Sequence, residues 1–257
     1  MKIKRITLPV SLVCNLSCKN CSVFDFIGGK PLRYKYMTPG QVKEILDKLV
    51  KCEIEVGQVT LAGAEPFMNP DIGEIVDIVN SYGFKEVEII TNGTLLNKKN
   101  LEILKKVSNI SISIYPHTKS IQETLEKEGL VKEFDKNSYT WLRVTNDMYK
   151  YNQNVKIEDV QHNYDICSMK DKCLVVTTAG VYRCWVLYRL EQDICPYDKE
   201  KLQAYLSQKE PYGKCASCDH WLTPRLKHEC LNPENDKVVV EKAIELIKKS
   251  KEDTNEL

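Results

Sequence analysis

The chain has 257 residues, which is enough for one substantial hydrophobic core or for one core with a smaller appendage. Its 37 basic and 36 acidic residues nearly cancel, so the composition indicates neither a basic nucleic-acid-binding surface nor an acidic tail. No signal peptide precedes the first motif and no apolar run approaches the roughly 20 residues that span a bilayer. These features predict a cytoplasmic protein with no nucleic-acid or membrane partner.

The first part of the chain alternates predicted strands with predicted helices. Runs rich in Val, Ile and Leu predict strands over Ile3–Val10, Gln58–Leu61, Glu86–Thr91, Ile110–Tyr115 and Thr140–Val144. Start signals for the helices between them are Thr38-Pro39-Gly40-Gln41, Asn69-Pro70, Asn97 and the box Ser120–Glu123. The alternation predicts a first domain over residues 1–146 with a parallel sheet, open or closed into a barrel.

The pattern changes after residue 146. Residues 147–235 are irregular and rich in cysteine, and they contain a predicted hairpin, Leu174–Thr178 and Val181–Val186, which turns at Ala179-Gly180. A third segment, residues 236–257, begins with a predicted amphipathic helix over Asp236–Lys249 and ends in a frayed tail. We therefore expect a small second domain followed by a terminal helix.

Cysteines are numerous and unevenly placed. Of the eleven, Cys14, Cys18 and Cys21 follow the first predicted strand, and seven fall between Cys167 and Cys230. Stable disulfides are disfavoured in a reducing cytosol, so the clustering indicates metal. Three thiolates in one loop can hold three corners of a four-iron cluster and leave the fourth iron open. A zinc site that lacks one ligand, or three unrelated loop thiols, are the alternatives.

The motif Cys14-x3-Cys18-x2-Cys21 resembles the CxxxCxxC signature of radical S-adenosylmethionine (SAM) enzymes. The resemblance covers roughly residues 1–145. It implies an α/β fold, a partial (β/α)6 TIM-like barrel, and a [4Fe–4S] cluster whose open iron binds SAM. An enzyme of this kind also needs a reducing electron donor such as flavodoxin or ferredoxin.

Other segments are similar to SAM-binding elements of the same family. Ala62-Gly63-Ala64-Glu65-Pro66 resembles the GGEP motif, whose backbone and acidic side chain hold the methionine amino group of SAM. Thr91-Asn92-Gly93 resembles a TNG element near the adenosyl group, and the resemblance places Ser111 and Ser113 near the ribose. Two residues depart from the pattern. Asn20 stands where an aromatic residue usually lies beside adenine, and Ala64 replaces the second glycine.

The later cysteines resemble the twitch or SPASM extension of this family. In that extension a hairpin and a later CxxC hold an auxiliary [4Fe–4S] cluster, and the resemblance gives as its ligands Cys173, Cys184, Cys215 and Cys218, with Cys167 competing with Cys173. A structural zinc site on the same cysteines is the alternative. We expect one auxiliary cluster, which leaves Cys195 and Cys230 unassigned, and a buried thiol without chemistry at Cys52.

The resemblance implies reductive cleavage of SAM to a 5′-deoxyadenosyl radical. A short chain with one auxiliary cluster is similar to the dehydrogenases of aminoglycoside biosynthesis, so the predicted function is oxidation of a small polyol or sugar-like molecule. Arg143 is a predicted substrate anchor because a charge on a buried strand needs a polar partner, and Tyr115 and His117 are candidate pocket residues. Two alternatives remain: a peptide- or protein-modifying enzyme (thioether formation, epimerisation or formylglycine formation) and a non-catalytic iron–sulfur electron-transfer protein.

Overall fold

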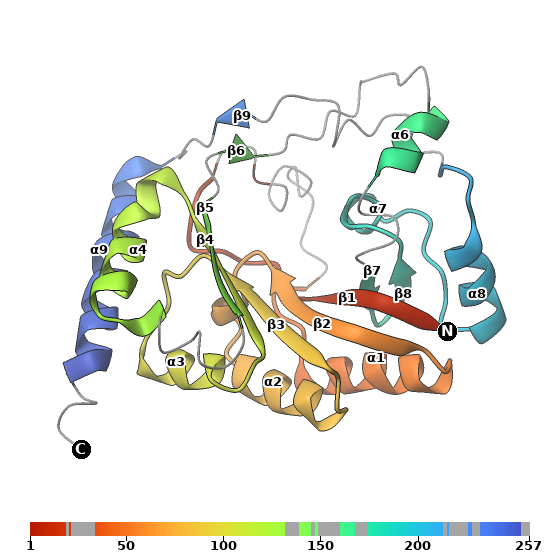
Figure 1. The fold of residues 1–257 in the computed structure, drawn as a ribbon, viewed down its shortest axis with the longest axis horizontal. Coiled ribbons are helices and arrows are strands. Elements are labelled where there is room, and N and C mark those ends of the chain that lie inside the picture. The colour runs from red at the N-terminus through yellow and green to blue at the C-terminus, as the bar shows by residue number, and fades with distance from the viewer. Residues whose placement is uncertain are drawn as a thin grey trace.

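The computed structural model describes residues 1–18, 21, 34–131, 139–144, 147–148, 160–167, 174–212, 215, 226–227 and 232–252. Seven strands form one sheet in the order β5-β4-β3-β2-β1-β7-β8 (Figure 1). Five of the seven strands are parallel to one another and belong to the strand–helix units. They are β1 (Lys2–Ser11), β2 (Glu55–Gly63), β3 (Glu86–Thr91), β4 (Asn109–Ile114) and β5 (Tyr139–Val144). The predicted class, a partial TIM-like α/β fold with a C-terminal hairpin, is confirmed.

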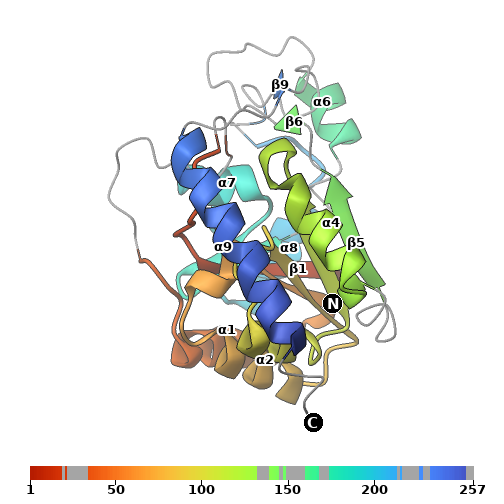
Figure 2. The same ribbon diagram turned by 90° about the vertical axis from the view of Figure 1, so that its left-hand side faces the viewer.

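Four helices connect these strands and cover one face of the sheet (Figures 1 and 2): α1 (Pro39–Lys51), α2 (Ile72–Ser81), α3 (Lys98–Leu104) and α4 (Lys119–Lys127). The predicted caps at Thr38 and Asn97 are confirmed, because each side chain accepts a hydrogen bond from the first turn of its helix. The predicted start at Ser120 is wrong. A 3-10 turn, η2 (Pro116–Thr118), runs directly into α4 and starts that helix one residue earlier.

The hydrophobic core lies between the sheet and these helices. Alternate residues of the strands, such as Ile6 and Leu8 of β1 or Val59 and Leu61 of β2, have no exposed surface. Side chains alternate between the two faces of a strand, so the residues between them point to the other face. That second face is the one available for a site.

The predicted hairpin does not stand apart from the main sheet. Its first strand, β7 (Leu174–Thr177), pairs in parallel with β1, and its second strand, β8 (Gly180–Tyr182), pairs antiparallel with β7. The second strand was predicted to reach Val186, and this is wrong. The chain turns into α7 (Trp185–Leu190) because the sulfur of Cys184 accepts a hydrogen bond from the backbone of Leu187 at 3.4 Å and caps that helix.

Further elements complete the C-terminal part: α6 (Val160–Ile166), α8 (Lys199–Ser207) and a short antiparallel pair, β6 (Asp147–Met148) with β9 (Leu226–Lys227). The terminal helix α9 (Pro233–Glu252) packs against α4 and α3 (Figure 2). It begins before the predicted Asp236 because Asn232 caps it, accepting a hydrogen bond from the backbone of Asn235 at 3.2 Å. Among the described helices, none combines the length and apolarity needed to cross a membrane.

Candidate active site

The loop after β2 is attached directly to the cysteine loop after β1. The backbone N–H of Ala64 donates to the carbonyl oxygen of Ser11 at 2.8 Å, and that of Glu65 donates to Val13 at 3.0 Å. Gly63 has a positive φ of 134°, and a Cβ there would collide with the backbone of Ser11. The close approach therefore requires glycine at position 63, while alanine is accommodated at position 64.

The Glu65 side chain joins the two segments that resemble SAM-binding motifs. Its carboxylate is fully buried and accepts hydrogen bonds from the hydroxyl of Thr91 at 2.8 Å and the backbone N–H groups of Asn92 at 2.7 Å and Phe67 at 3.1 Å. Phe67 belongs to the 3-10 turn η1 (Pro66–Met68), which Glu65 caps. Burial raises the pKa of Glu65 to about 7, although these donors oppose the shift. A contact of Glu65 with the methionine end of SAM stays a prediction.

Replacing Glu65 by Ala should weaken SAM binding and leave the iron content unchanged. The substitution leaves the buried donors of Thr91, Asn92 and Phe67 without an acceptor. We therefore also expect the free energy of unfolding to fall by about 3 kcal/mol. Isothermal titration with SAM and chemical denaturation measure the two effects. The matched control is Glu74→Ala on the exposed side of α2. Unaltered SAM affinity in the Glu65 variant would remove this role.

The same carboxylate predicts a pH dependence of stability. The pKa of Glu65 in the folded protein, about 7, lies above the ordinary value of 4.5. Between these two pH values the folded protein therefore binds one proton more than the unfolded chain. The contribution of Glu65 to stability is therefore complete below pH 4.5 and is lost as the pH rises towards 7. Denaturation of the wild type at several pH values should show this decline, and the Glu65→Ala variant should lack it.

Asn92, at the end of β3, reaches the first cysteine of the motif. Its amide nitrogen donates to the sulfur of Cys14 at 3.5 Å and to the side-chain oxygen of Asn15 at 3.1 Å. Asn15 in turn donates to the hydroxyl of Thr94 at 2.8 Å, and the backbone of Thr94 donates to Asn92 at 2.9 Å. Neither Asn15 nor Thr94 was predicted from the sequence as a site residue. Their positions inside the cysteine motif and directly after Asn92-Gly93 were the available signals.

The three thiols of the motif all lie close enough to one side chain to affect its pKa. Burial and the nearby Cys18, Cys21 and Cys14, in that order, raise the pKa of Tyr115 at the end of β4. Burial and the charge of Glu65 raise the pKa of Cys14 to about 12. A thiolate here therefore requires a cation, which an iron–sulfur cluster supplies.

The donor set fits an iron–sulfur cluster better than a single ion. The sulfur of Cys14 accepts hydrogen bonds from the Asn92 amide and, at 3.4 Å, from the backbone of Leu16, as cluster sulfurs commonly do. Within the ranges that the structure describes, no three His, Cys, Asp or Glu side chains are close enough to hold one metal ion. A four-iron cluster binds each thiolate at a different corner, so its ligands are spaced more widely. We conclude that Cys14, Cys18 and Cys21 suit a cluster.

Polar side chains line the sheet face opposite the helices. Glu88 of β3 is buried and accepts hydrogen bonds from Thr60 of β2 at 2.8 Å, from Gln58 at 3.0 Å and from Ser111 of β4 at 2.7 Å. Arg5 of β1 lies 4.0 Å from Glu88, and its Nε is buried without a hydrogen-bond partner in the described structure. Ser111 therefore binds Glu88, while its predicted contact with ribose stays a prediction. Glu88 was not identified from the sequence.

The structure describes the remaining predicted site residues of the first domain only in part. Arg143 pairs in register with Ser113, which puts both residues at one level of adjacent strands, but the side chain of Arg143 and the whole of Asn20 lie outside the described residues. The rings of Tyr115 and His117 are stacked with centroids 5.9 Å apart, and both residues are half-buried. Burial lowers the pKa of His117, although Asp236 opposes this shift.

Two of the later cysteines border one aromatic cluster, and a third lies near one of them. Cys184 and Cys215 pack against the buried group of Tyr182, Tyr188 and Tyr212 with their neighbours, and Cys167 follows α6 close enough to Cys215 to raise its pKa, after the larger effect of burial. The structure thus places Cys184 and Cys215, from two segments of the chain, at one aromatic cluster. Cys173, Cys218 and Cys230 lie outside the described residues. Cys195 and Cys52 are buried free thiols.

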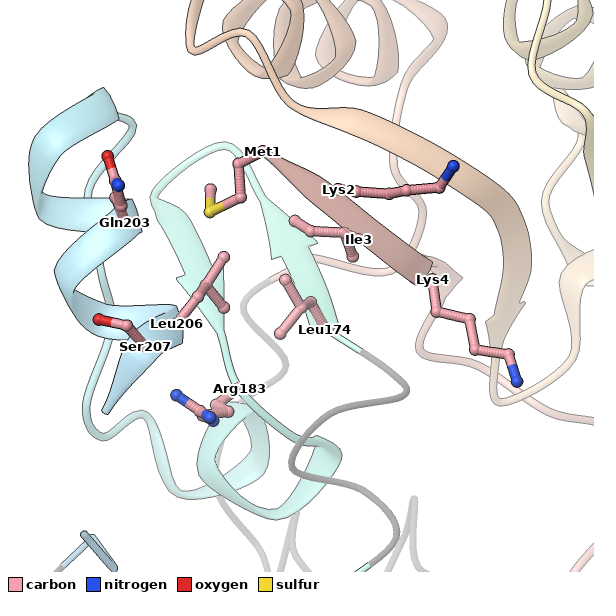
Figure 3. Close-up of a pocket in the computed structure, with 9 residues that line it drawn as sticks. All are labelled: Met1, Lys2, Ile3, Lys4, Leu174, Arg183, Gln203, Leu206 and Ser207. Atoms are coloured by element: carbon pink, nitrogen blue, oxygen red, sulfur yellow. The ribbon is translucent and has the colours of Figure 1, made fainter. Parts of the chain in front are cut away.

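A cavity of about 420 Å³ lies at the opposite end of β1 from the cysteine loop (Figure 3). It is lined by the first residues of β1 and by Leu174, Arg183 and Leu206 of the hairpin region and α8. The guanidinium of Arg183 is already bound, donating to the carbonyl oxygen of Tyr205 at 2.5 Å. None of the cysteines that the structure describes lines this cavity, so we do not assign the chemistry to it.

Solved structures with the same fold were found by comparison. BtrN in an open conformation superposes with a TM-score of 0.55 at 16% identity, covering 88% of this chain and 95% of BtrN. Streptococcus suis SuiB bound to its precursor peptide SuiA superposes with a TM-score of 0.53 at 15% identity, covering 84% of this chain and 69% of SuiB. The protein anSMEcpe with AdoMet and the Cp18Cys peptide gives 0.51 at 10% identity, covering 97% and 99%. At these identities the likeness concerns the fold alone.

Curated sequences match the N-terminal part. A probable GTP 3',8-cyclase of Methanothermobacter marburgensis is 34% identical over 93 residues, 35% of this chain and 28% of that protein. The subtilosin biosynthesis protein AlbA of Bacillus subtilis is 35% identical over 99 residues, 38% of this chain and 20% of AlbA. The chain thus spans less than a third of the length of these relatives.

The sequence from residue 8 to residue 143, more than half of the chain, matches the model of the Radical SAM superfamily. The match includes the cysteine motif, the loop around Glu65 and the segment around Asn92. Membership of this superfamily disfavours the alternative of a non-catalytic electron carrier. The chain is a member of the radical SAM superfamily, and its cofactors are a [4Fe–4S] cluster and SAM.

Proposed function

We propose that this enzyme oxidises a secondary alcohol of a small polyol or sugar-like molecule. The observation that carries the proposal is the polar sheet face opposite the helices, where Thr60, Glu88 and Ser111 form one hydrogen-bonded group. A ligand rich in hydroxyl groups matches such a face, because each hydroxyl needs donors and acceptors when it is buried. The fold shared with BtrN, whose complex contains AdoMet and 2-DOIA, supports the same choice.

The residues of this chain have separate tasks in the proposed reaction. Cys14, Cys18 and Cys21 hold the cluster, and the loops that Glu65 and Asn92 join hold SAM. When bound, these cofactors supply a radical that removes one hydrogen atom from a substrate carbon. The protein orients that carbon and excludes water and other hydrogen donors. Arg143, on the edge strand β5, is the proposed substrate anchor.

Cys184 and Cys215, with Cys167 or Cys173 and with Cys218 as the further ligands, would hold a second cluster. Such a cluster would supply the acceptor for the second electron when the alcohol loses two hydrogens overall and becomes a ketone. The shared aromatic surroundings of Cys184 and Cys215 support this assignment.

Modification of a peptide is the second candidate. It is favoured by the extent of the match to anSMEcpe, whose complex holds a peptide and whose chain is covered almost completely. Peptide substrates would also find hydrogen-bonding groups on the polar face. The two candidates therefore require a direct comparison of substrates.

The test offers reconstituted protein, SAM and dithionite to two sets of compounds. One is a panel of cyclitols, aminocyclitols including 2-DOIA, and simple sugars, and the other is a set of short cysteine- and serine-containing peptides. We expect a polyol to stimulate formation of 5′-deoxyadenosine and to yield a product two hydrogens lighter by mass spectrometry. Stimulation and modification confined to the peptides would contradict the proposal.

A further inference from the structure

The cysteine loop is held by a residue from the far end of the chain. Asp236, in the first turn of α9, is fully buried, and both of its carboxylate oxygens lie 3.3 Å from the backbone nitrogen of Ser17, which donates to them. The hydroxyl of Ser17 also donates to Asp236 at 3.2 Å. Ser17 lies between Cys14 and Cys18, the first two ligands of the cluster, although 219 residues separate it from Asp236.

Two neighbouring groups strengthen this attachment. The backbone N–H of Asn232, the cap of α9, donates to the hydroxyl of Ser17 at 3.0 Å. Nε2 of His117, in η2, lies 3.3 Å from a carboxylate oxygen of Asp236. Asp236 thus meets the cysteine loop and the segment after β4 at one point. Figure 2 shows the N-terminal end of α9 beside the chain that follows β1.

The contact between Asp236 and Ser17 couples the docking of α9 to the conformation of the cysteine loop. Burying a carboxylate away from solvent raises the free energy of the folded protein unless strong hydrogen bonds replace those that water made. Ser17 supplies such bonds only when the loop between Cys14 and Cys18 has the conformation seen here. Docking of α9 and the shape of the cysteine loop are therefore coupled. A buried negative charge beside the loop also favours the more positive, oxidised state of a nearby cluster.

We propose that Asp236 is a positioning residue for the SAM-binding cluster: through Ser17 it fixes the loop between Cys14 and Cys18, and its charge lowers the reduction potential of the cluster. The proposed action of Asp236 on the cluster runs through Ser17 and through its charge, not through coordination of iron. The inference concerns the N-terminal cluster alone, so it holds whether the substrate is a polyol or a peptide.

The test compares Asp236→Asn, Asp236→Ala and Ser17→Ala in the full-length, reconstituted enzyme. The control is Glu241→Gln, which changes an exposed carboxylate of the same helix, 3.9 Å from Lys237. Iron content, the EPR spectrum with and without SAM, and a potentiometric titration are measured. The change of the spectrum on SAM addition reports the cluster with the open iron.

We expect Asp236→Asn to keep its iron and to shift the potential of that cluster to more positive values. Asp236→Ala and Ser17→Ala should bind less iron and cleave SAM about tenfold more slowly or worse, because the ligands are displaced. Glu241→Gln should match the wild type. Wild-type iron, spectrum and potential in both Asp236→Asn and Ser17→Ala would overturn the proposal, and these two variants decide it if Asp236→Ala does not fold.

Discussion

Replacing Cys14, Cys18 and Cys21 together by Ala should lower the iron bound by anaerobically reconstituted protein from about eight atoms per chain to about four. The three thiols belong to one loop near Tyr115, and no other described cysteine lies in that loop. With the cluster lost, no electron can reach SAM, so formation of 5′-deoxyadenosine should cease. Iron analysis and chromatography measure the two effects.

The matched control for this experiment is Cys52→Ala. Cys52 is also a buried free thiol, but it closes α1 and lies among apolar side chains of the core. Its removal should leave iron and SAM cleavage unchanged. Full iron content in the triple variant would show that the cluster is held elsewhere. Zinc in place of the second four irons would support the structural-zinc alternative for the later cysteines.

Replacing Cys184 and Cys215 together by Ala should abolish oxidation of the substrate while cleavage of SAM continues. Cleavage needs only the N-terminal cluster, whereas the proposed oxidation also needs an acceptor for the second electron. The variant should therefore release 5′-deoxyadenosine without a product two hydrogens lighter. Both residues lie at one aromatic cluster, so their loss should remove the auxiliary iron together.

Cys195→Ala is the control for the double variant. Cys195 is buried and its backbone pairs with Val181 beside the hairpin, but its thiol points to the carbonyl oxygen of Pro196 rather than to the aromatic cluster. We expect this variant to keep its iron and its turnover. Equal product formation by the double variant and the wild type would end the assignment of an electron acceptor to these cysteines.

Local signals predicted most of the first domain. The cap at Thr38 and the spacing of the apolar residues after it predicted α1. The predicted strand Glu86–Thr91 agrees with β3 residue by residue. Such features depend on neighbours in sequence, because a cap bonds within one turn and a buried strand needs only a run of β-branched residues. The cysteine motif is local in the same sense, since three ligands of one cluster lie within eight residues.

Contacts between distant residues were not predictable from these signals. Pairing of β7 with β1 joins segments more than 160 residues apart, and no feature of Leu174–Thr177 specifies that partner. The sequence suggested Glu65 from a motif, but its bonds to Thr91 and Asn92 depend on how two loops meet. Asp236 appears in the sequence as an ordinary acidic residue near a helix start. Cys184 was expected within the second strand of the hairpin, yet its side chain caps the helix α7.

The most direct test of the account is the number of SAM molecules and electrons consumed for each molecule of product. An oxidation in which the substrate provides both electrons requires one SAM per product and only a priming amount of reductant. We predict this stoichiometry for the polyol that stimulates SAM cleavage, together with a product two hydrogens lighter. A product of unchanged mass, or a requirement for one equivalent of reductant per turnover, would contradict the account and indicate epimerisation or rearrangement.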